Sequence, residues 1–232
     1  MIIQIYAFTD VETAVVAAQL GVNHIGFVAG KYGEVPAELS FEEAYAIAAA
    51  LPPETVAVAL TMAIEVNEIL QMAREVKPDV VHISSDLDCV GVDKMRELKS
   101  QLDQNIRLMK AIPVEGEASI AIAKQYAQVS DLLLLDTKRS DFPGVGATGS
   151  THDWNISRRI IEAVKVPVIL AGGLTPQNVG TAINITHPYG VDSNTSTNIP
   201  GSNTKKDIQR MAEFVKAVRI AENEQKNELS ER

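Results

Sequence analysis

The residues best suited to chemistry lie at the end of an apolar run, residues 132–136, and in the segment after it. Four consecutive leucines are typical of a strand buried on both faces, and Asp136 ends the run. A glycine-rich stretch, residues 144–149, then leads to a helical pattern that starts near Asn155. Parallel α/β proteins use this order of elements to place an acid beside an anion site. A turn-forming aspartate and glycines that only bend the loop would produce the same pattern.

Two later segments are also apolar strand patterns that end in glycines or small polar residues. Residues 166–173 form an apolar run that ends in Gly172 and Gly173, where glycine lets backbone N–H groups face an anion. Residues 189–196 end in small polar donors, among them Asn194 and Thr195. Loops after the last two strands often bind phosphate in (β/α)8 barrels. We therefore predict a phosphate site formed by these two loops.

Length and composition limit the class of protein. A chain of 232 residues, 46% of them hydrophobic, suits one α/β domain with a large core. No apolar run approaches the length of a membrane span, and no basic leader precedes one, so we expect a cytoplasmic protein without a membrane partner. The lone Cys89 excludes an intrachain disulfide and a Cys-rich metal site, and the net charge of -9 argues against a nucleic-acid partner.

Strand and helix patterns alternate along the chain, which favours a parallel sheet. We predict a single (β/α)8 TIM barrel over residues 1–222, followed by a charged tail over residues 223–232 that frays. The eight expected strands are residues 2–7, 24–28, 55–61, 80–84, 106–112, 132–136, 166–172 and 190–194. The expected helices include residues 66–76, 92–102, 119–129 and 207–222. A capping box at Ser40 is expected to open another helix, and Thr175 is expected to be the N-cap of a further helix with Pro176 as its first residue. The long segment 137–153 is expected to be a functional loop.

These segments together resemble the phosphoribosylanthranilate isomerase family, the barrel enzymes of tryptophan biosynthesis, over residues 2–219. The matching stretches are DVETAVVAAQLGVNHIGFV at 10–28, LLDT at 134–137, GATG at 146–149 with Asp153-Trp154, and LAGGLTPQNV at 170–179. The resemblance implies a (β/α)8 fold and an Amadori-type aldose-to-ketose rearrangement of a phosphorylated sugar ligand. It also implies that Asp136 is the general acid, and that no metal or organic cofactor takes part.

Four positions depart from the pattern of that family. Tyr6 stands where the family has a cysteine as general base, and a tyrosine pKa of about 10 is too high for a base at neutral pH. Ala37 stands where the family has an arginine that holds the anthranilate carboxylate, in a loop with two glutamates. Residues 82–85 replace a Gln-Leu-His-Gly-like end, and residues 194–198 lack a Ser-Ser-Gly-like core. We therefore expect poor or no turnover of phosphoribosylanthranilate.

Histidine titrates nearest to neutral pH and is the leading substitute base. His82 ends the fourth strand, on the same face as Ser84, and His152 lies after the glycine-rich stretch near the barrel mouth. A core histidine bonded to a backbone carbonyl is an equal alternative for His82. His24 is expected to be structural and His187 to be exposed.

Other polar residues are assigned to binding, each with an alternative. Asp153 raises the pKa of Asp136 or caps the next helix. Lys110 neutralises an oxyanion, forms a Schiff base, or pairs with an acid at the rim. Arg139 meets an anionic group or is solvated, and Tyr6 stacks on the substrate or blocks the vacated pocket. The predicted binding residues are Tyr6, Lys110, Arg139, Gly146, Thr148, Gly149, Asp153, Gly172, Gly173, Asp192, Asn194 and Thr195.

Four functions remain open from the sequence. The first is an isomerase or epimerase with an altered phosphorylated sugar substrate, in which His82 or His152 removes a proton and Asp136 supplies one. The second is phosphoribosylanthranilate isomerase itself, working with substituted residues. The third is a lyase or aldolase that uses Lys110, and the fourth is a non-catalytic sugar-phosphate binding protein. No His/Asp spacing typical of a metal site is present, and the chain is expected to be a monomer or homodimer.

Overall fold

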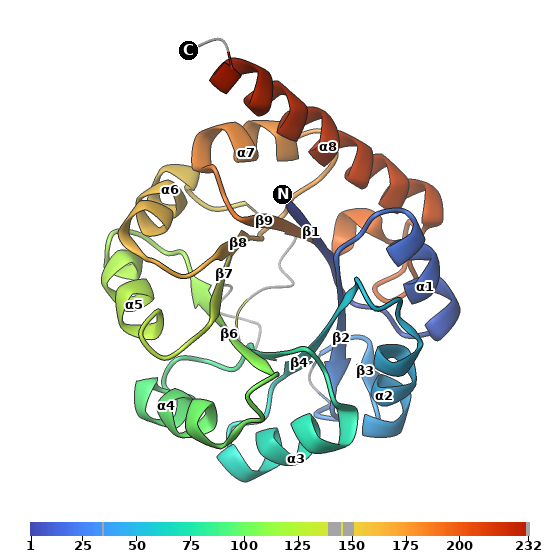
Figure 1. Cartoon of the computed structure of the whole chain (residues 1–232), viewed down its shortest axis with the longest axis vertical. Helices are drawn as coiled ribbons and strands as arrows, with labels where there is room; N and C mark the ends of the chain where they lie inside the picture. The colour runs from blue at the N-terminus through green and yellow to red at the C-terminus, as the bar shows by residue number, and fades with distance from the viewer. Residues whose placement is uncertain (34, 139–144, 146–150, 231–232) are drawn as a thin grey trace.

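Parallel strands close into a barrel in the computed structural model, which describes residues 1–33, 35–138, 145 and 151–230 (Figure 1). The barrel strands are β1 (Ile2–Ile5), β2 (His24–Ala29), β4 (Val56–Thr61), β5 (Val80–Ile83), β6 (Arg107–Pro113), β7 (Leu132–Asp136), β8 (Val168–Leu170) and β9 (Gly190–Ser193). The pairing of β1 with both β9 and β2 closes the ring, so the predicted (β/α)8 barrel is confirmed. A short strand, β3 (Glu38–Leu39), pairs in parallel with the end of β2 and was not expected from the sequence.

Helices surround the barrel (Figure 1). They are α1 (Val11–Gln19), α2 (Phe41–Ala50), α3 (Val66–Val76), α4 (Val92–Gln101), α5 (Ala118–Tyr126), α6 (Trp154–Ala163), α7 (Val179–Thr186) and α8 (Ile208–Ser230), with a 3-10 turn, η1 (Thr195–Thr197). The capping box at Ser40 and Glu43 opens α2 as predicted. The predicted start of α7 is wrong. Thr175 begins a turn closed by the Asn178 side chain, and the helix starts only after that turn.

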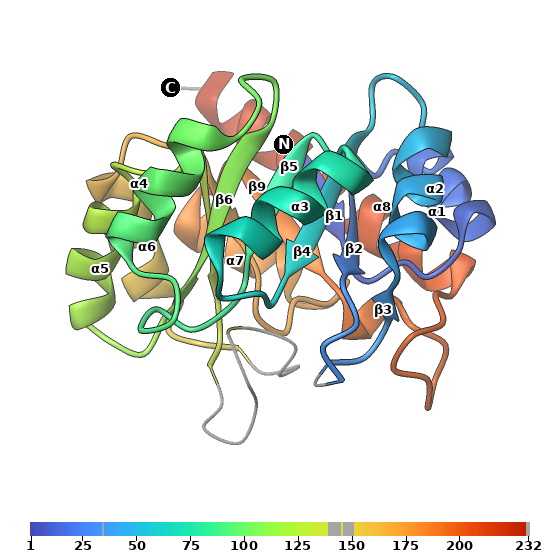
Figure 2. The ribbon, with the colours of Figure 1, turned by 90° about the horizontal axis from the view of Figure 1, so that it is seen from below.

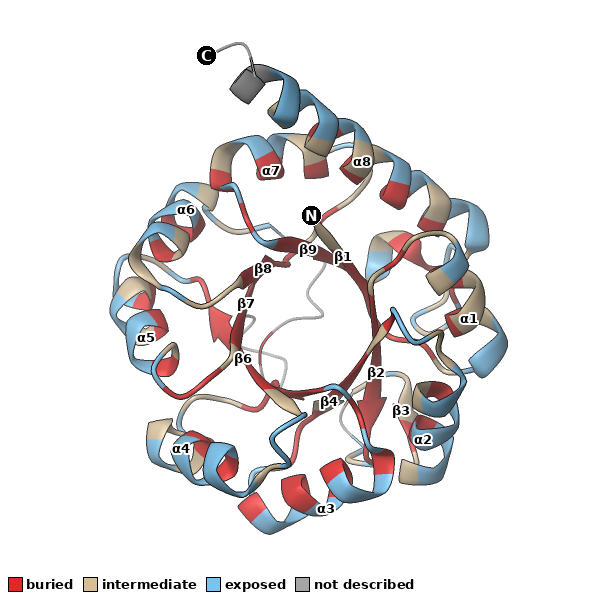
Figure 3. Cartoon of the chain, viewed as in Figure 1, coloured by how far each residue is buried: buried red, intermediate tan, exposed pale blue. Residues whose placement is uncertain are grey.

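Side chains alternate between the barrel interior and the helix layer, as the two-residue period of a strand requires. A smaller core cluster fills the interior with Tyr6, Ala7, Val28, Val58, Val80, Met109, Ala111, Leu132, Leu134, Val145, Ile169 and Ala171. The larger cluster joins the outer faces of the strands to the helices. Figure 3 shows the strands buried almost throughout and the helices buried mainly where they face the barrel. Because the interior is packed, a ligand is confined to the strand ends.

Helix α8 continues beyond the predicted barrel boundary at residue 222 and ends at Ser230, so the expected fraying tail is largely helical. The Gln225 side chain donates to the carbonyl oxygen of Ile183 and contacts Nδ1 of His187, at 3.1 and 3.0 Å, which ties this extension to α7. His187 is exposed, as expected. Across the described ranges, no helix has the length and apolar character of a bilayer span.

The loops after the strands gather along one edge of the barrel, which is the lower edge in Figure 2. Val145 lies on the end of β5 there. Its N–H donates to the carbonyl oxygen of Ser84, and its own carbonyl oxygen accepts from the Ser84 hydroxyl, at 3.0 and 2.9 Å. Val145 is therefore fixed at the carboxyl end of β5.

Candidate active site

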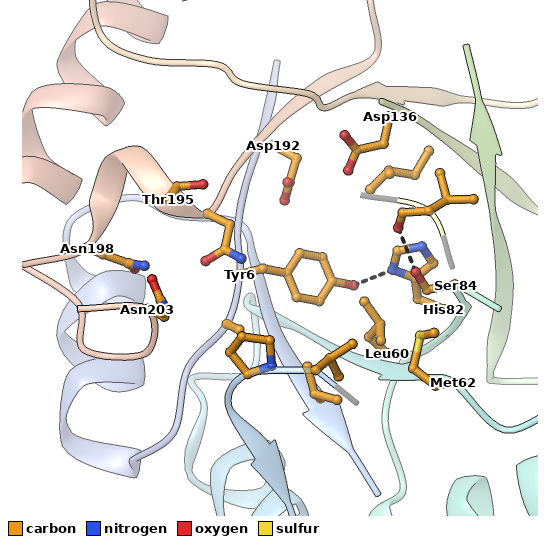
Figure 4. Close-up of a pocket in the computed structure, with 17 residues that line it drawn as sticks. Tyr6, Leu60, Met62, His82, Ser84, Asp136, Asp192, Thr195, Asn198 and Asn203 are labelled. Carbon is orange, nitrogen blue, oxygen red and sulfur yellow. Dashed lines mark hydrogen bonds between the residues drawn. The ribbon is translucent and has the colours of Figure 1, made fainter. Parts of the chain in front are cut away.

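Two adjoining pockets open at the carboxyl ends of the strands and share Asp136, Asp192, Asn194 and Thr195 as walls. The larger has a cavity volume of about 280 Å³, and its other lining residues are Tyr6, Ala7, Val28, Val35, Pro36, Leu60, Met62, His82, Ser84, Leu134, Val145, Asn198 and Asn203 (Figure 4). The smaller has a volume of about 260 Å³ and is completed by Gly172, Gly173, Leu174, Thr175, Ser193 and Ser196. The larger pocket is therefore mainly apolar, and the smaller pocket is lined mainly by glycines and small polar residues.

The smaller pocket brings together the four residues predicted for phosphate, because it lies between the ends of β8 and β9. Gly172 and Gly173 have φ angles of +84° and +61°, which favour glycine. A Cβ at position 172 would lie 2.8 Å from the Thr137 hydroxyl, so a side chain there is excluded. The Ser193 hydroxyl donates to the carbonyl oxygen of Leu174 at 3.0 Å and joins the two loops.

Lys206 supports the second of these loops and was missed from the sequence. Its ammonium group donates to the carbonyl and side-chain oxygens of Asn194, to the Thr197 hydroxyl and to Oδ1 of Asn198, at 2.6 to 3.1 Å. Burial lowers the pKa of Lys206 to about 7, while the charge of Asp192 acts in the opposite direction. No local pattern marks this lysine, because its partners lie 8 to 12 residues earlier in the chain.

Asp136 and Asp192 meet where the two pockets join (Figure 4). Burial raises the pKa of Asp136 to about 7. Burial, and then the charge of Asp136, raise the pKa of Asp192 to about 8. Gln4 donates from Nε2 to Oδ1 of Asp192 at 3.1 Å, and the backbone N–H of Thr137 donates to Oδ1 of Asp136 at 2.7 Å. Since the two carboxyl groups interact, their titrations belong to the pair, which holds a proton near neutral pH.

Tyr6 and His82 form a buried pair on the opposite wall, with 2.8 Å between the tyrosine oxygen and Nδ1 of the histidine (Figure 4). Burial, and then the charge of Asp192, hold the pKa of Tyr6 well above its ordinary value of 10.0. Burial, and then the charge of Lys110, lower the pKa of His82 to about 3. A Cβ at Gly26 would lie 2.3 Å from the Tyr6 ring, so this ring occupies the space over β2. His82 lies where the sequence predicts, but its surroundings oppose the predicted role as a base.

The structure corrects the prediction for His152. This residue lies behind the smaller pocket, with Nε2 2.7 Å from the Ser157 hydroxyl and Nδ1 3.2 Å from the Thr137 hydroxyl, and it lines neither pocket. The ring is held between α6 and the end of β7, directly behind Gly172 of the smaller pocket. Burial lowers its pKa to about 4, which also disfavours a role in proton transfer.

The structure also corrects the binding roles predicted for Lys110 and Asp153. Lys110 shares the outer face of β6 with Leu108 and Ile112, and donates to the carbonyl oxygen of Ser85 at 2.5 Å, so strand alternation points it away from the barrel interior. No acid pairs with it among the described residues. Asp153 is exposed and caps α6 by accepting from the N–H of Asn155, which is the alternative role considered for it.

Some predictions lie outside the described residues, namely those for Arg139, Gly146, Thr148 and Gly149. In the described walls of the two pockets, no lysine or arginine is present. Lys138, the residue before Arg139, forms an ion pair with Asp86 at 2.7 Å. His24 is buried and donates from Nδ1 to Oε1 of Gln4 at 3.1 Å, so its structural role stands as expected.

Comparisons with known proteins agree with this geometry. Residues 3–217 match the protein family described as N-(5'-phosphoribosyl)anthranilate (PRA) isomerase. N-(5'-phosphoribosyl)anthranilate isomerase 2 of Methanosarcina mazei is 37% identical over 93% of this chain and 92% of its own length. The solved phosphoribosyl anthranilate isomerase of Thermotoga maritima superposes with a TM-score of 0.76, at 26% identity, over 94% of this chain and 99% of that one.

A further solved phosphoribosyl anthranilate isomerase, in complex with reduced 1-(o-carboxyphenylamino)-1-deoxyribulose 5-phosphate, shares the fold. Its TM-score is 0.74 at 24% identity, over 94% of this chain and 99% of that one. The match with the family extends over nearly the whole barrel, and it includes both loops of the smaller pocket and the strand that ends in Asp136. This chain therefore belongs to the N-(5'-phosphoribosyl)anthranilate isomerase family.

Proposed function

We propose that this protein isomerises N-(5'-phosphoribosyl)anthranilate in tryptophan biosynthesis, using substituted active-site residues. The sequence favoured an altered substrate because of Tyr6 and Ala37, but the family match and the relatives' names support the parent substrate instead. The observation that carries the proposal is the pair of pockets that meet at two carboxyl groups. A small polar pocket, an acid and an apolar pocket follow the order of phosphate, ribose and aryl ring in this substrate.

The phosphate would occupy the smaller pocket, where Gly172 and Gly173 leave the backbone accessible and the η1 loop supplies small polar side chains. The aromatic ring would occupy the larger pocket, against Val28, Leu60 and Met62. Its volume of about 280 Å³ exceeds the roughly 150 Å³ of an apolar cavity that holds benzene. The ribose would then lie over Asp136.

Asp136 would protonate the ring oxygen of the ribose and open the ring. An acid at neutral pH needs a raised pKa, and burial raises that of Asp136 to about 7. The described walls carry no cation for the anthranilate carboxylate. The side chains of Asn198 and Asn203 line the larger pocket and offer amide groups in its place.

The test is turnover of phosphoribosylanthranilate by the purified chain, followed by the loss of anthranilate-type fluorescence. We expect measurable isomerisation, and rescue of a tryptophan auxotroph that lacks this activity. Glu117→Gln, on the exposed start of α5, serves as a control variant that keeps wild-type activity. A protein that binds the reduced product analogue but does not turn over the substrate would be a sugar-phosphate binding protein instead. Failure in both assays would exclude the parent substrate.

A further inference from the structure

We infer that Asp192 is the general base that removes the C2′ proton of the substrate, the task that Tyr6 is unable to perform. This inference rests on the proposed function and deepens it. Asp192 lies on β9, is 7% exposed, and lines both pockets beside Asp136.

The titratable groups of the site leave few alternatives. Along the described walls of both pockets, the titratable side chains are Tyr6, His82, Asp136 and Asp192. A tyrosine whose pKa is held well above 10.0 does not ionise at neutral pH. His82, with its pKa lowered to about 3, is a very weak base, and its Nε2 atom is buried without a hydrogen-bond partner among the described residues. Asp136 already serves as the acid, so Asp192 remains for the base.

The contacts of Asp192 leave one of its oxygens available. Oδ1 accepts from Nε2 of Gln4, whose own Oε1 accepts from Nδ1 of His24, so the carboxyl group is held from behind by a buried hydrogen-bond chain. Oδ2 makes no hydrogen bond within the described part of the chain. A carboxylate with one oxygen fixed and the other facing a pocket is oriented for proton transfer.

Charged and titratable groups on several elements act on Asp192. Asp136, on β7, favours its neutral form, while Gln4 and Lys206 favour its ionised form. Tyr6, on the neighbouring strand, stays neutral. His24, behind Gln4, has its pKa lowered to about 4 by burial and by Arg107, and is therefore neutral as well. The hydrogen bond from Gln4 and the charge of Lys206 thus oppose the effects of burial and of Asp136 on Asp192. The two carboxyl groups share a proton near neutral pH, and the proposed reaction starts from the form in which Asp136 carries it.

The resulting reaction balances without another reactant. Asp136 gives its proton to the ring oxygen, the bond from C1′ to that oxygen breaks, and the nitrogen lone pair forms a C1′=N iminium. Asp192 takes the proton from C2′, the C–H electron pair forms a C1′=C2′ double bond, and the C=N π pair returns to nitrogen. Asp192 then delivers its proton to C1′, while Asp136 accepts the proton of the C2′ hydroxyl, which becomes the ketone. Both carboxyl groups regain their starting states.

The experiment measures single-turnover rates with substrate that carries hydrogen or deuterium at C2′. Asp192→Asn should lose about 100- to 10,000-fold in rate and express a larger isotope effect than wild type, because the C2′ step then limits turnover. It should still bind the reduced product analogue. Asp93→Asn, on the exposed face of α4, is the matched control and should keep the wild-type rate. His82→Gln should lose less than Asp192→Asn.

Each other outcome decides against the inference. A wild-type rate for Asp192→Asn overturns it, as does an isotope-sensitive loss confined to His82→Gln. If Asp192→Asn no longer binds the analogue, Asp192→Glu is the second variant, because it restores a carboxylate. It must recover part of the rate of C2′ proton removal, and an equal loss of rate in both variants overturns the role of Asp192 as the base. An inactive wild-type protein overturns the proposed function and this inference together, whereas an active wild type with an active Asp192→Asn overturns only the inference.

Discussion

Asp136 and Tyr6 both lie at the barrel mouth, but their surroundings differ. Those of Asp136 suit the proposed general acid, whereas Tyr6 packs as part of the pocket wall. Asp136 ends β7 beside Asp192 and has the raised pKa that an acid needs at neutral pH. Tyr6, where the sequence resembles the position of a catalytic cysteine, has a buried ring over Gly26 and a hydroxyl group bonded to His82. Its contacts are those of a structural residue.

Asp136→Asn keeps the size of the side chain and removes the proton. We expect turnover to fall by about 100- to 10,000-fold, the usual contribution of a general acid. Binding of the reduced product analogue should remain. The measurement is kcat together with the dissociation constant of the analogue. Unchanged kcat would exclude Asp136 from the mechanism.

Tyr6→Phe removes the hydroxyl group that bonds His82 and leaves Nδ1 without its partner. Since Nε2 already lacks one among the described residues, we expect the free energy of unfolding to fall by about 1–3 kcal/mol, the cost of an unsatisfied buried polar group. Urea denaturation measures this change. Tyr45→Phe, at an exposed position on α2, is the control. No difference between the two variants would show that the pair contributes nothing to stability.

At the scale of elements, the smaller pocket is formed by two loops that different interactions hold in place. The loop after β8 needs glycines with positive φ angles, while the loop after β9 is held from beneath by Lys206. Both loops carry the small polar or glycine residues that the sequence suggested. The lysine that orders the second loop enters from the segment before α8.

Lys206→Met keeps the aliphatic stem and removes the ammonium group. We expect binding of the phosphorylated substrate to weaken, seen as an increase in KM larger than the decrease in kcat, because Asn194, Thr197 and Asn198 lose their common donor. Lys205→Met is the matched control, since its side chain is exposed. Equal KM values for the two variants would refute a positioning role for Lys206.

For the whole molecule, the buried carboxyl pair of the candidate active site lowers the stability of the folded chain when it ionises. Both carboxyl groups have higher pKa values in the folded chain than in the unfolded chain. At a pH between the unfolded-state and folded-state values, the folded protein therefore binds more protons, and its stability falls as pH rises. The resulting cost is absent below the ordinary pKa of about 4 for an aspartate. It grows as pH rises through about 7 and about 8, the folded-state pKa values of Asp136 and Asp192, and it is complete above them.

Asp192→Asn should therefore raise Tm relative to wild type at pH 8 and change it less at pH 5. Asp93→Asn should show no such dependence, because that side chain is 96% exposed. Scanning calorimetry at both pH values checks this. A Tm difference that is the same at both pH values would mean that ionisation of Asp192 carries no cost in the folded protein.

Several features of the molecule follow from local sequence alone. The alternation of apolar strands with amphipathic helices determines the barrel, because each pattern has its own period and parallel strands need a helix between them. Strand β7 and helix α3 match their predicted bounds, since their apolar runs have distinct ends. The glycines and small polar residues that end β8 and β9 indicate the smaller pocket, because neighbouring parallel strands end at the same edge.

Only the tertiary structure decides which polar side chains face the site. Lys110 and His82 lie on adjacent strands, yet one side chain points out to the helices and the other into the barrel, and a one-residue shift in register would exchange them. Asp192 and Gln4 are 188 residues apart, and Lys206 meets the η1 loop because the chain turns back after Asn198, with which Lys206 forms an antiparallel bridge. The pKa of a carboxyl group depends on burial and on neighbours from distant segments. The proposed proton-transfer roles therefore depend on closure of the barrel rather than on any local motif.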